Sequence, residues 1–137
     1  MNSVQEYEMK LRDDQWEVLG PILIGKQGDA GARGQNNRLF IEAVWWVVSK
    51  NSNWCNLPPE YGNWNAAYMR FRRWNEANFW RYLAGSRIAE PALALMLSQI
   101  ADYADRYTQK IREKIYRRNQ KAIYKGITNK DQSAIPL

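Results

Sequence analysis

The sequence predicts an all-α protein, in which a compact domain of helix-turn-helix type is followed by a long, basic C-terminal helix. Three observations support this fold class. Apolar residues in the main segments recur at spacings of three and four, which is the period of a helix. Aromatic residues are concentrated between Phe40 and Tyr82, so the core should lie there. An apolar seam beyond residue 88 is followed by a run of cations.

At 137 residues the chain suits one domain plus an appendage. The expected organisation is a lead-in over residues 1–10, the helix-turn-helix domain over 11–87, an amphipathic and then basic helical region over 88–125, and a disordered tail over 126–137.

Composition narrows the function. A net charge of +6 and a pI near 9.5 favour an anionic partner. No histidine is present, which removes Ser-His-Asp, Cys-His and His-metal chemistry. The single cysteine, Cys55, allows no internal disulfide and no cysteine pair for a metal. We therefore expect no catalytic residue, no metal site and no cofactor.

The sequence also predicts a cellular location. Acidic residues near the start are atypical of a signal peptide, and the longest apolar run, residues 40–48, contains Glu42 and is too short to span a bilayer. We expect a cytoplasmic protein without a membrane partner.

The first helix is expected to begin at Asp13 or Asp14, which can cap it, and to run to Leu19. Gly20 and Pro21 then end it or kink it. From residue 25 to residue 34 glycine occurs at every third position, which predicts a flexible surface loop. In an alternative interpretation, Lys26 and Arg33 form a basic arm that follows a phosphate backbone or enters a minor groove.

The strongest helix signal covers residues 38–50, with Asn36 or Asn37 as its cap. Its apolar residues cover so much of the circumference that the helix should be nearly buried: Leu39, Phe40, Ala43, Val44, Trp46 and Val47. Residues 51–57 read as a turn with Trp54 as a hydrophobic plug. Pro58 is suited to begin a helix of one or two turns that ends at Gly62.

The next helix carries the predicted binding surface. Asn65 is its expected N-cap, and an apolar stripe should anchor it: Trp64, Tyr68, Phe71 and Trp74. Arg70 and Arg73 are expected to point away from that stripe, toward a major groove. Two short helices joined by a tight turn predict a helix-turn-helix unit. The alternative is a helical bundle that presents its arginines on a solvated face.

The C-terminal region should begin at Glu90 and Pro91. A heptad-like seam then comprises Leu93, Leu97, Ile100, Ala104, Tyr107 and Ile111. This seam either packs back on the N-terminal domain or forms a homodimer through residues 93–111. The basic run that follows comprises Lys110, Arg112, Lys114, Arg117, Arg118, Lys121 and Lys125, with Glu113 as its one acid.

Three blocks of residues resemble the N-terminal domain of bacterial insertion-sequence transposases of the four/five group, which precedes their DDE catalytic core. The first is L-R-D-D-Q-W-E over residues 11–17. The second comprises Asn37, Arg38, Phe40, Glu42, Ala43, Val44, Trp46 and Val47. The third comprises Trp54, Leu57, Pro58, Tyr61, Gly62, Trp64, Tyr68, Arg70, Phe71, Arg73 and Trp74. The resemblance implies a helical domain that binds terminal inverted repeats and has Arg70, Arg72 and Arg73 on the DNA. It also implies a bacterial protein that is associated with the nucleoid.

The sequence departs from this family pattern at two places. The family's Gly-Arg-Pro-Arg loop is replaced by residues 31–34, Gly-Ala-Arg-Gly, which weakens the arm interpretation. The Asp-Ser-Thr motif with the first catalytic aspartate is absent, and Asp102 and Asp105 form only an i, i+3 pair without a third carboxylate.

The sequence therefore predicts a non-catalytic protein that binds double-stranded DNA, as a first-frame, truncated or domesticated form of such a transposase. An acidic protein, bound as a target of inhibition, is the alternative partner, and the full-length transposase is a further one. The predicted DNA-binding residues are Asn65, Met69, Arg70, Arg72, Arg73, Lys26, Arg33, Lys110, Lys114, Arg117, Arg118 and Lys121.

Overall fold

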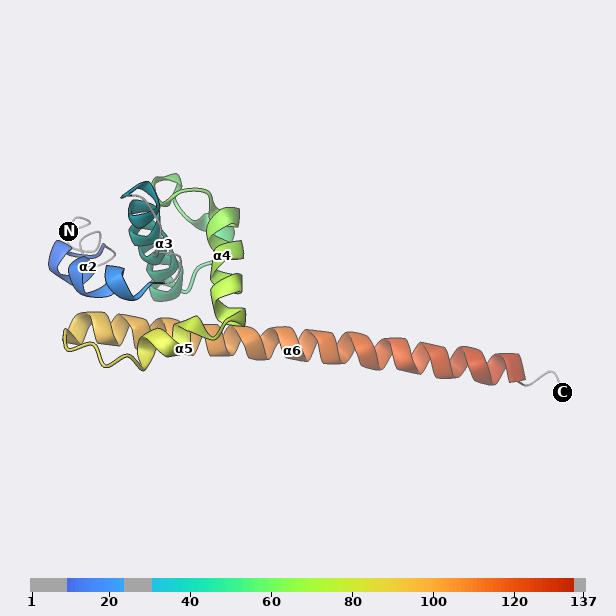
Figure 1. The fold of residues 1–137 in the computed structure, drawn as a ribbon. Helices are drawn as coiled ribbons and strands as arrows, with labels where there is room; N and C mark the ends of the chain where they lie inside the picture. Colours follow the sequence, from blue (N-terminus) through green and yellow to red (C-terminus); the bar gives the residue numbers. More distant parts are fainter. Residues whose placement is uncertain (1–9, 24–30, 135–137) are drawn as a thin grey trace. The chain divides into compact units, whose positions relative to one another are not determined.

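The computed structural model describes the backbone of residues 10–23 and 31–134, and the side chains of residues 10–23 and 37–127. Within these ranges the protein is all-α, as predicted, with five α-helices and no strand (Figure 1). The chain divides into two compact units, the first ending at Tyr103 and the second beginning at Ala104. This division lies inside the last helix, beyond the expected boundary at residue 87.

Helix α2 (Asp13–Leu19) begins directly after Arg12. The predicted caps, Asp13 and Asp14, instead occupy its first turn. The side-chain oxygen of Gln15 accepts a hydrogen bond from the Arg12 backbone N–H at 2.9 Å, which satisfies a donor ahead of the first turn. Helix α2 ends at Leu19, directly before Gly20 and Pro21, as predicted, and the 3₁₀ turn η1 (Gly20–Ile22) follows it without a break.

Helix α3 (Gly31–Lys50) begins well before the predicted start at Arg38. The predicted loop is therefore wrong over residues 31–34, and the predicted caps Asn36 and Asn37 lie inside the helix. A glycine costs only about 1 kcal/mol in a helix, and a helix nucleated by its apolar half extends at low cost. Arg33 consequently belongs to a helix and not to an arm, whereas Lys26 lies outside the described residues.

The core forms where α3 meets helices α4 (Trp64–Glu76) and α5 (Phe79–Ala84). The prediction that α3 is nearly buried is confirmed for Phe40, Ala43, Val44 and Val47, while Leu39 and Trp46 are half-buried. The Trp80 ring lies 5.9 Å from Phe40, 5.6 Å from Phe71 and 5.2 Å from Trp74, measured between centroids. The aromatic region between Phe40 and Tyr82 thus supplies the centre of the core, as predicted, while α2 and the start of α6 add buried residues that were not expected there.

The segment between α3 and α4, residues 51–63, contains two 3₁₀ turns, η2 (Trp54–Asn56) and η3 (Pro59–Tyr61). The helix predicted over residues 58–62 is thus a single 3₁₀ turn, and the connection is longer than the three or four residues of a helix-turn-helix. Trp54 is buried as the predicted plug, with its indole N–H donating to the Tyr103 hydroxyl at 3.1 Å.

A tight turn instead follows α4, because only Ala77 and Asn78 separate α4 from α5. Asn78 has a φ of 59°, a left-handed conformation that asparagine tolerates better than most residues. The Trp80 indole N–H then donates to the Phe71 carbonyl at 3.2 Å, which fixes α5 against α4.

Helix α6 (Pro91–Ala134) starts as predicted, with Glu90 as the cap and Pro91 in the first turn. Leu93, Leu97 and Ile100 are buried within the first unit, so the first half of the seam packs on its own domain. A homodimer cannot use these three positions while that unit is folded. Residues 126–134 continue the helix where an irregular tail was expected.

Polar contacts attach α2 and the two residues before it to α3 and to the start of α6. The Glu42 carboxylate on α3 accepts from the Leu11 N–H at 2.9 Å, and Arg38 donates to the Leu11 carbonyl at 2.6 Å. Glu90, at the start of α6, contacts the Arg12 guanidinium at 3.0 Å and the Gln15 amide at 3.3 Å.

The Glu90 carboxylate should make folding pH-dependent. Its pKa lies below the usual range, chiefly because it accepts a hydrogen bond from the Leu93 backbone N–H, with further contributions from Gln15 and Arg12. A carboxylate with a lowered folded-state pKa contributes stability above its unfolded pKa of about 4.3, and this contribution is lost as pH falls through the folded value.

We predict that Glu90→Gln lowers the free energy of unfolding at pH 7 and that the difference from the wild type shrinks toward pH 3. Urea unfolding followed by circular dichroism at both pH values measures this difference. Asp14, whose pKa is lowered chiefly by a hydrogen bond from Arg12, also titrates in this range, so Asp14→Asn serves as the comparison. An equal Glu90→Gln deficit at both pH values would show that its charge has no role.

Candidate nucleic-acid interface

Helix α4 has one face in the core and one in solvent. Its buried residues are Ala67, Phe71 and Trp74. Asn63 caps it, since its side-chain oxygen accepts from the N–H groups of Asn65 at 2.8 Å and Ala66 at 3.1 Å. The prediction of Asn65 as the cap is therefore wrong, because the helix starts at Trp64, two residues earlier than expected.

The predicted apolar stripe of α4 is only partly correct. Phe71 and Trp74 are buried as expected, and Tyr68 is half-buried. Trp64 is 41% exposed and does not anchor the helix. Trp64 lies in the first turn of α4, next to the connecting segment. The buried position one turn later is occupied by the small residue Ala67.

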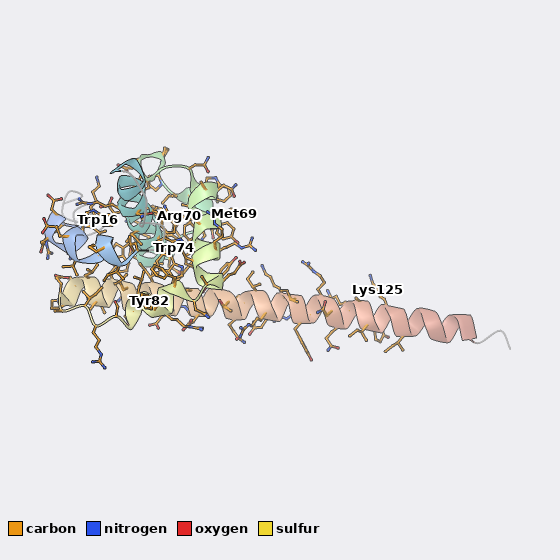
Figure 2. All side chains as sticks on the ribbon, in the orientation of Figure 1. Trp16, Met69, Arg70, Trp74, Tyr82 and Lys125 are labelled. Atoms are coloured by element: carbon orange, nitrogen blue, oxygen red, sulfur yellow. The ribbon has the colours of Figure 1, made fainter. Side chains whose placement is uncertain are left out.

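Arg70 does not point away from the core. Its guanidinium carbon lies 4.4 Å from the centroid of the Phe40 ring and 5.2 Å from that of Trp74. One of its terminal nitrogens donates to the side-chain oxygen of Asn37, which is 2% exposed. The expectation that Arg70 faces a groove is thus wrong in its geometry. This arginine bridges α4 and α3, and Figure 2 shows it with Trp74 on the side of α4 that faces α3.

The outer face of α4 carries four of the predicted DNA-binding residues. Asn65, Met69 and Arg73 follow one another at intervals of four residues, and all three are exposed. Arg72 lies beside them, half-buried, with its guanidinium carbon 5.8 Å from the Tyr68 ring centroid. Met69 lies on the side of α4 away from α3 (Figure 2).

This face combines an amide, a thioether and two guanidinium groups. An amide can pair with adenine, an apolar side chain can contact the thymine methyl group, and arginine can bind guanine with two hydrogen bonds. From Asn65 to Arg73 the helix rises about 12 Å, which is close to the width of the major groove of B-DNA. The residue types and the length both suit contact with base edges.

The remaining predicted cations lie in the second unit. Lys110, Lys114, Arg117, Arg118 and Lys121 are all exposed on α6. The side chain of Arg33 is outside the described ranges, as is the whole of Lys26.

Sequence reasoning missed the structural role of several polar residues. Gln15, Asn37 and Glu42 are buried, and each joins segments that are distant in the sequence. Asn37 and Glu42 accept hydrogen bonds from Arg70 and the Leu11 N–H, whereas the Gln15 amide donates to Glu90. The sequence signal that could have revealed these roles is a polar residue within a strongly apolar segment, such as Glu42 between Ile41 and Ala43. Among the described residues, no group of three or more acidic or cysteine side chains is placed to hold a metal ion. None of the described helices combines the length and apolar character needed to cross a membrane.

Comparison with known proteins gives a family match. The family described as "Putative transposase of IS4/5 family (DUF4096)" matches residues 11–84, which is more than half of the chain. A curated relative from Sinorhizobium fredii, "Uncharacterized protein y4sN", is 42% identical over 67 residues, covering 48% of this chain and 53% of the relative. The chain therefore spans about half the length of the curated relative that it matches. No solved structure matches.

Replacing Arg70 should destabilise the first unit. In Arg70→Ala, the buried Asn37 side chain loses its donor and the Phe40 and Trp74 rings lose the cation that covers them. Leaving a buried polar group unpaired costs about 1–3 kcal/mol. We expect a loss of this size in urea unfolding. Arg73→Ala, on the exposed face of the same helix, should change stability by no more than about 0.5 kcal/mol. Equal stabilities for the two variants would contradict the bridging role of Arg70.

Proposed function

The chain belongs to the IS4/5 transposase family, and we propose that it binds duplex DNA through the outer face of α4 without cutting or joining strands itself. The observation that supports this best is that one side of α4 is fixed in the core while the other side is exposed. Phe71 and Trp74 anchor one side of the helix, Arg70 ties it to α3, and Asn65, Met69 and Arg73 remain exposed on the other side.

The rigid placement of this face favours sequence-specific contacts with DNA bases. A helix held by buried rings presents its outer side chains with little freedom to lose on binding, so more of each contact is retained as affinity. Arg72 and Arg73 would contact guanine edges or flanking phosphates, while Asn65 and Met69 would discriminate adenine and thymine.

The biological target follows from the family. The resemblance in the sequence implies binding to the terminal inverted repeats of a mobile element, and the matched residues 11–84 include the whole of α4. Because the Asp-Ser-Thr motif is absent from the sequence, we propose that the chain occupies such ends and represses or assists a complete transposase.

We predict that a random duplex pool selected on the full chain yields sequences bound at least about tenfold more tightly than bulk DNA, because one good base contact contributes about 1–3 kcal/mol. In Arg72→Ala, Arg73→Ala this preference should fall toward that of bulk DNA. Competition binding by fluorescence anisotropy at near-physiological salt measures both values.

The matched control is Lys10→Ala, Lys50→Ala, which removes two exposed cations from other parts of the first unit. Both variants have a net charge of +4, since 6 − 2 = 4. If the control loses sequence preference as strongly as the α4 variant, total charge and not the α4 face governs binding. Weak DNA binding together with stoichiometric capture of an acidic protein would support the alternative interaction role.

A second prediction concerns catalysis. A supercoiled plasmid carrying the selected sequence should stay uncut when it is incubated with the full chain and Mg²⁺, because hydrolysis of this kind relies on several carboxylates that hold metal ions. Agarose electrophoresis detects nicked or linear product. Nicking that disappears with EDTA would show that the chain is itself an enzyme.

A further inference from the structure

All members of the basic run except Arg112 lie toward one side of a helix. Between residues 104 and 127, α6 is regular, and nearly all of its side chains beyond residue 111 are exposed. Lys110, Lys114, Arg117, Lys121 and Lys125 follow one another at intervals of four, three, four and four residues. These intervals keep them on a single face, and Arg118 lies beside them. We call these six cations the basic face.

The opposite side of the same helix has a different composition. Arg112, Tyr116, Asn119, Ile123 and Ile127 repeat the same intervals two residues later, about 200° around the helix. The one acid of this region, Glu113, contacts Gln109 at 3.3 Å. Among the described residues, no carboxylate forms an ion pair with a member of the basic face. As far as the described side chains extend, the cations are therefore aligned and have no carboxylate partner.

The basic face disfavours a parallel pairing of two copies of α6 that extends beyond residue 111. The seam of Leu93, Leu97 and Ile100 continues, at the same heptad spacing, to Lys114, Arg118 and Lys121. A second copy packed along this seam would bring like charges together at successive core positions, which is destabilising. A partner for this side of α6 must instead be anionic.

We propose that the basic face binds the phosphate backbone of duplex DNA without regard to sequence, as a site separate from α4. From Lys110 to Lys125 the helix rises about 22 Å, and a DNA strand presents a phosphate about every 3.4 Å along its axis, so each cation can meet a different phosphate. Of the two exposed tyrosines in this stretch, Tyr116 lies opposite the basic face and Tyr124 at its edge. Six cations with one ring beside them suit contact with phosphates better than stacking on successive unpaired bases.

An anionic lipid surface fits the second unit less well. A helix that lies in a membrane interface inserts an uncharged apolar face. The side opposite the basic face has Arg112 and Asn119 among its apolar residues, and burying a guanidinium or an amide in lipid is costly. The choice of DNA among nucleic acids rests on the proposed function of α4.

The test compares two triple variants of the full chain with equal net charge. Lys114→Gln, Arg117→Gln, Lys121→Gln changes the basic face, and Lys10→Gln, Lys50→Gln, Arg112→Gln removes the same charge from elsewhere, so both carry +3, since 6 − 3 = 3. The probe is a random-sequence duplex, titrated between about 50 and 200 mM NaCl. Circular dichroism verifies that each variant remains helical.

We expect the basic-face variant to lose on the order of tenfold in affinity for random duplex and to reduce the slope of log affinity against log salt by up to about 2.7, from three phosphate contacts. The control variant should keep most of the affinity for random duplex and most of the salt slope. Equal losses in the two variants, or no loss in either, would overturn the proposal.

Two further arms separate this proposal from others. The basic-face variant should retain its ratio of selected to random duplex affinity, whereas the Arg72→Ala, Arg73→Ala variant loses that ratio, so failure of α4 and failure of the basic face are distinguishable. Vesicles of phosphatidylserine and phosphatidylcholine form the second arm. Unchanged duplex binding together with lost vesicle binding in the basic-face variant would assign the face to lipid and overturn the proposal.

Discussion

The packing of aromatic rings around Trp80 is the interaction on which the first unit depends. Trp80 is 1% exposed, contacts rings from α3 and α4, and donates its indole N–H to the Phe71 carbonyl. An isolated helix as short as α4 is marginal in water, while each such ring pair contributes about 0.5–1.5 kcal/mol beyond its burial. Tertiary packing therefore decides both that α4 forms and which of its sides remains exposed.

Arg70 shows how a cation can serve the core and not the surface. A guanidinium is planar and weakly hydrated, so it can lie over Phe40 and Trp74 and still donate to the buried Asn37 amide. Lysine could not reproduce this arrangement, because its point charge lacks the planar fork. Two residues that carry the family resemblance, Asn37 and Arg70, are thus explained by their contact with each other.

The sequence predicted the helical class, the burial of α3 and the start of α6, because each rests on a strong local signal of apolar period or capping. It failed where the outcome depends on a partner distant in the chain. Arg70 lies at the edge of the α4 stripe, where periodicity does not distinguish a core position from a solvent-facing one. Its hydrogen bond to Asn37 on α3 turns it toward the core. The start of α3 at Gly31 was missed for a different reason, since glycine signals set element boundaries only weakly. The short helix predicted to end at Gly62 does so, as a single 3₁₀ turn over Pro59–Tyr61.

The proposed sites divide recognition between two kinds of force. Contacts from a row of cations to phosphates are long-ranged and indifferent to sequence, so they speed encounter and hold the protein near DNA of any kind. Base contacts from a few side chains act only at short range and distinguish one sequence from another. Because both sites belong to one chain, binding at the first raises the effective concentration for the second. A small reading face such as Asn65, Met69 and Arg73 can therefore select a target with far fewer contacts than it would need alone.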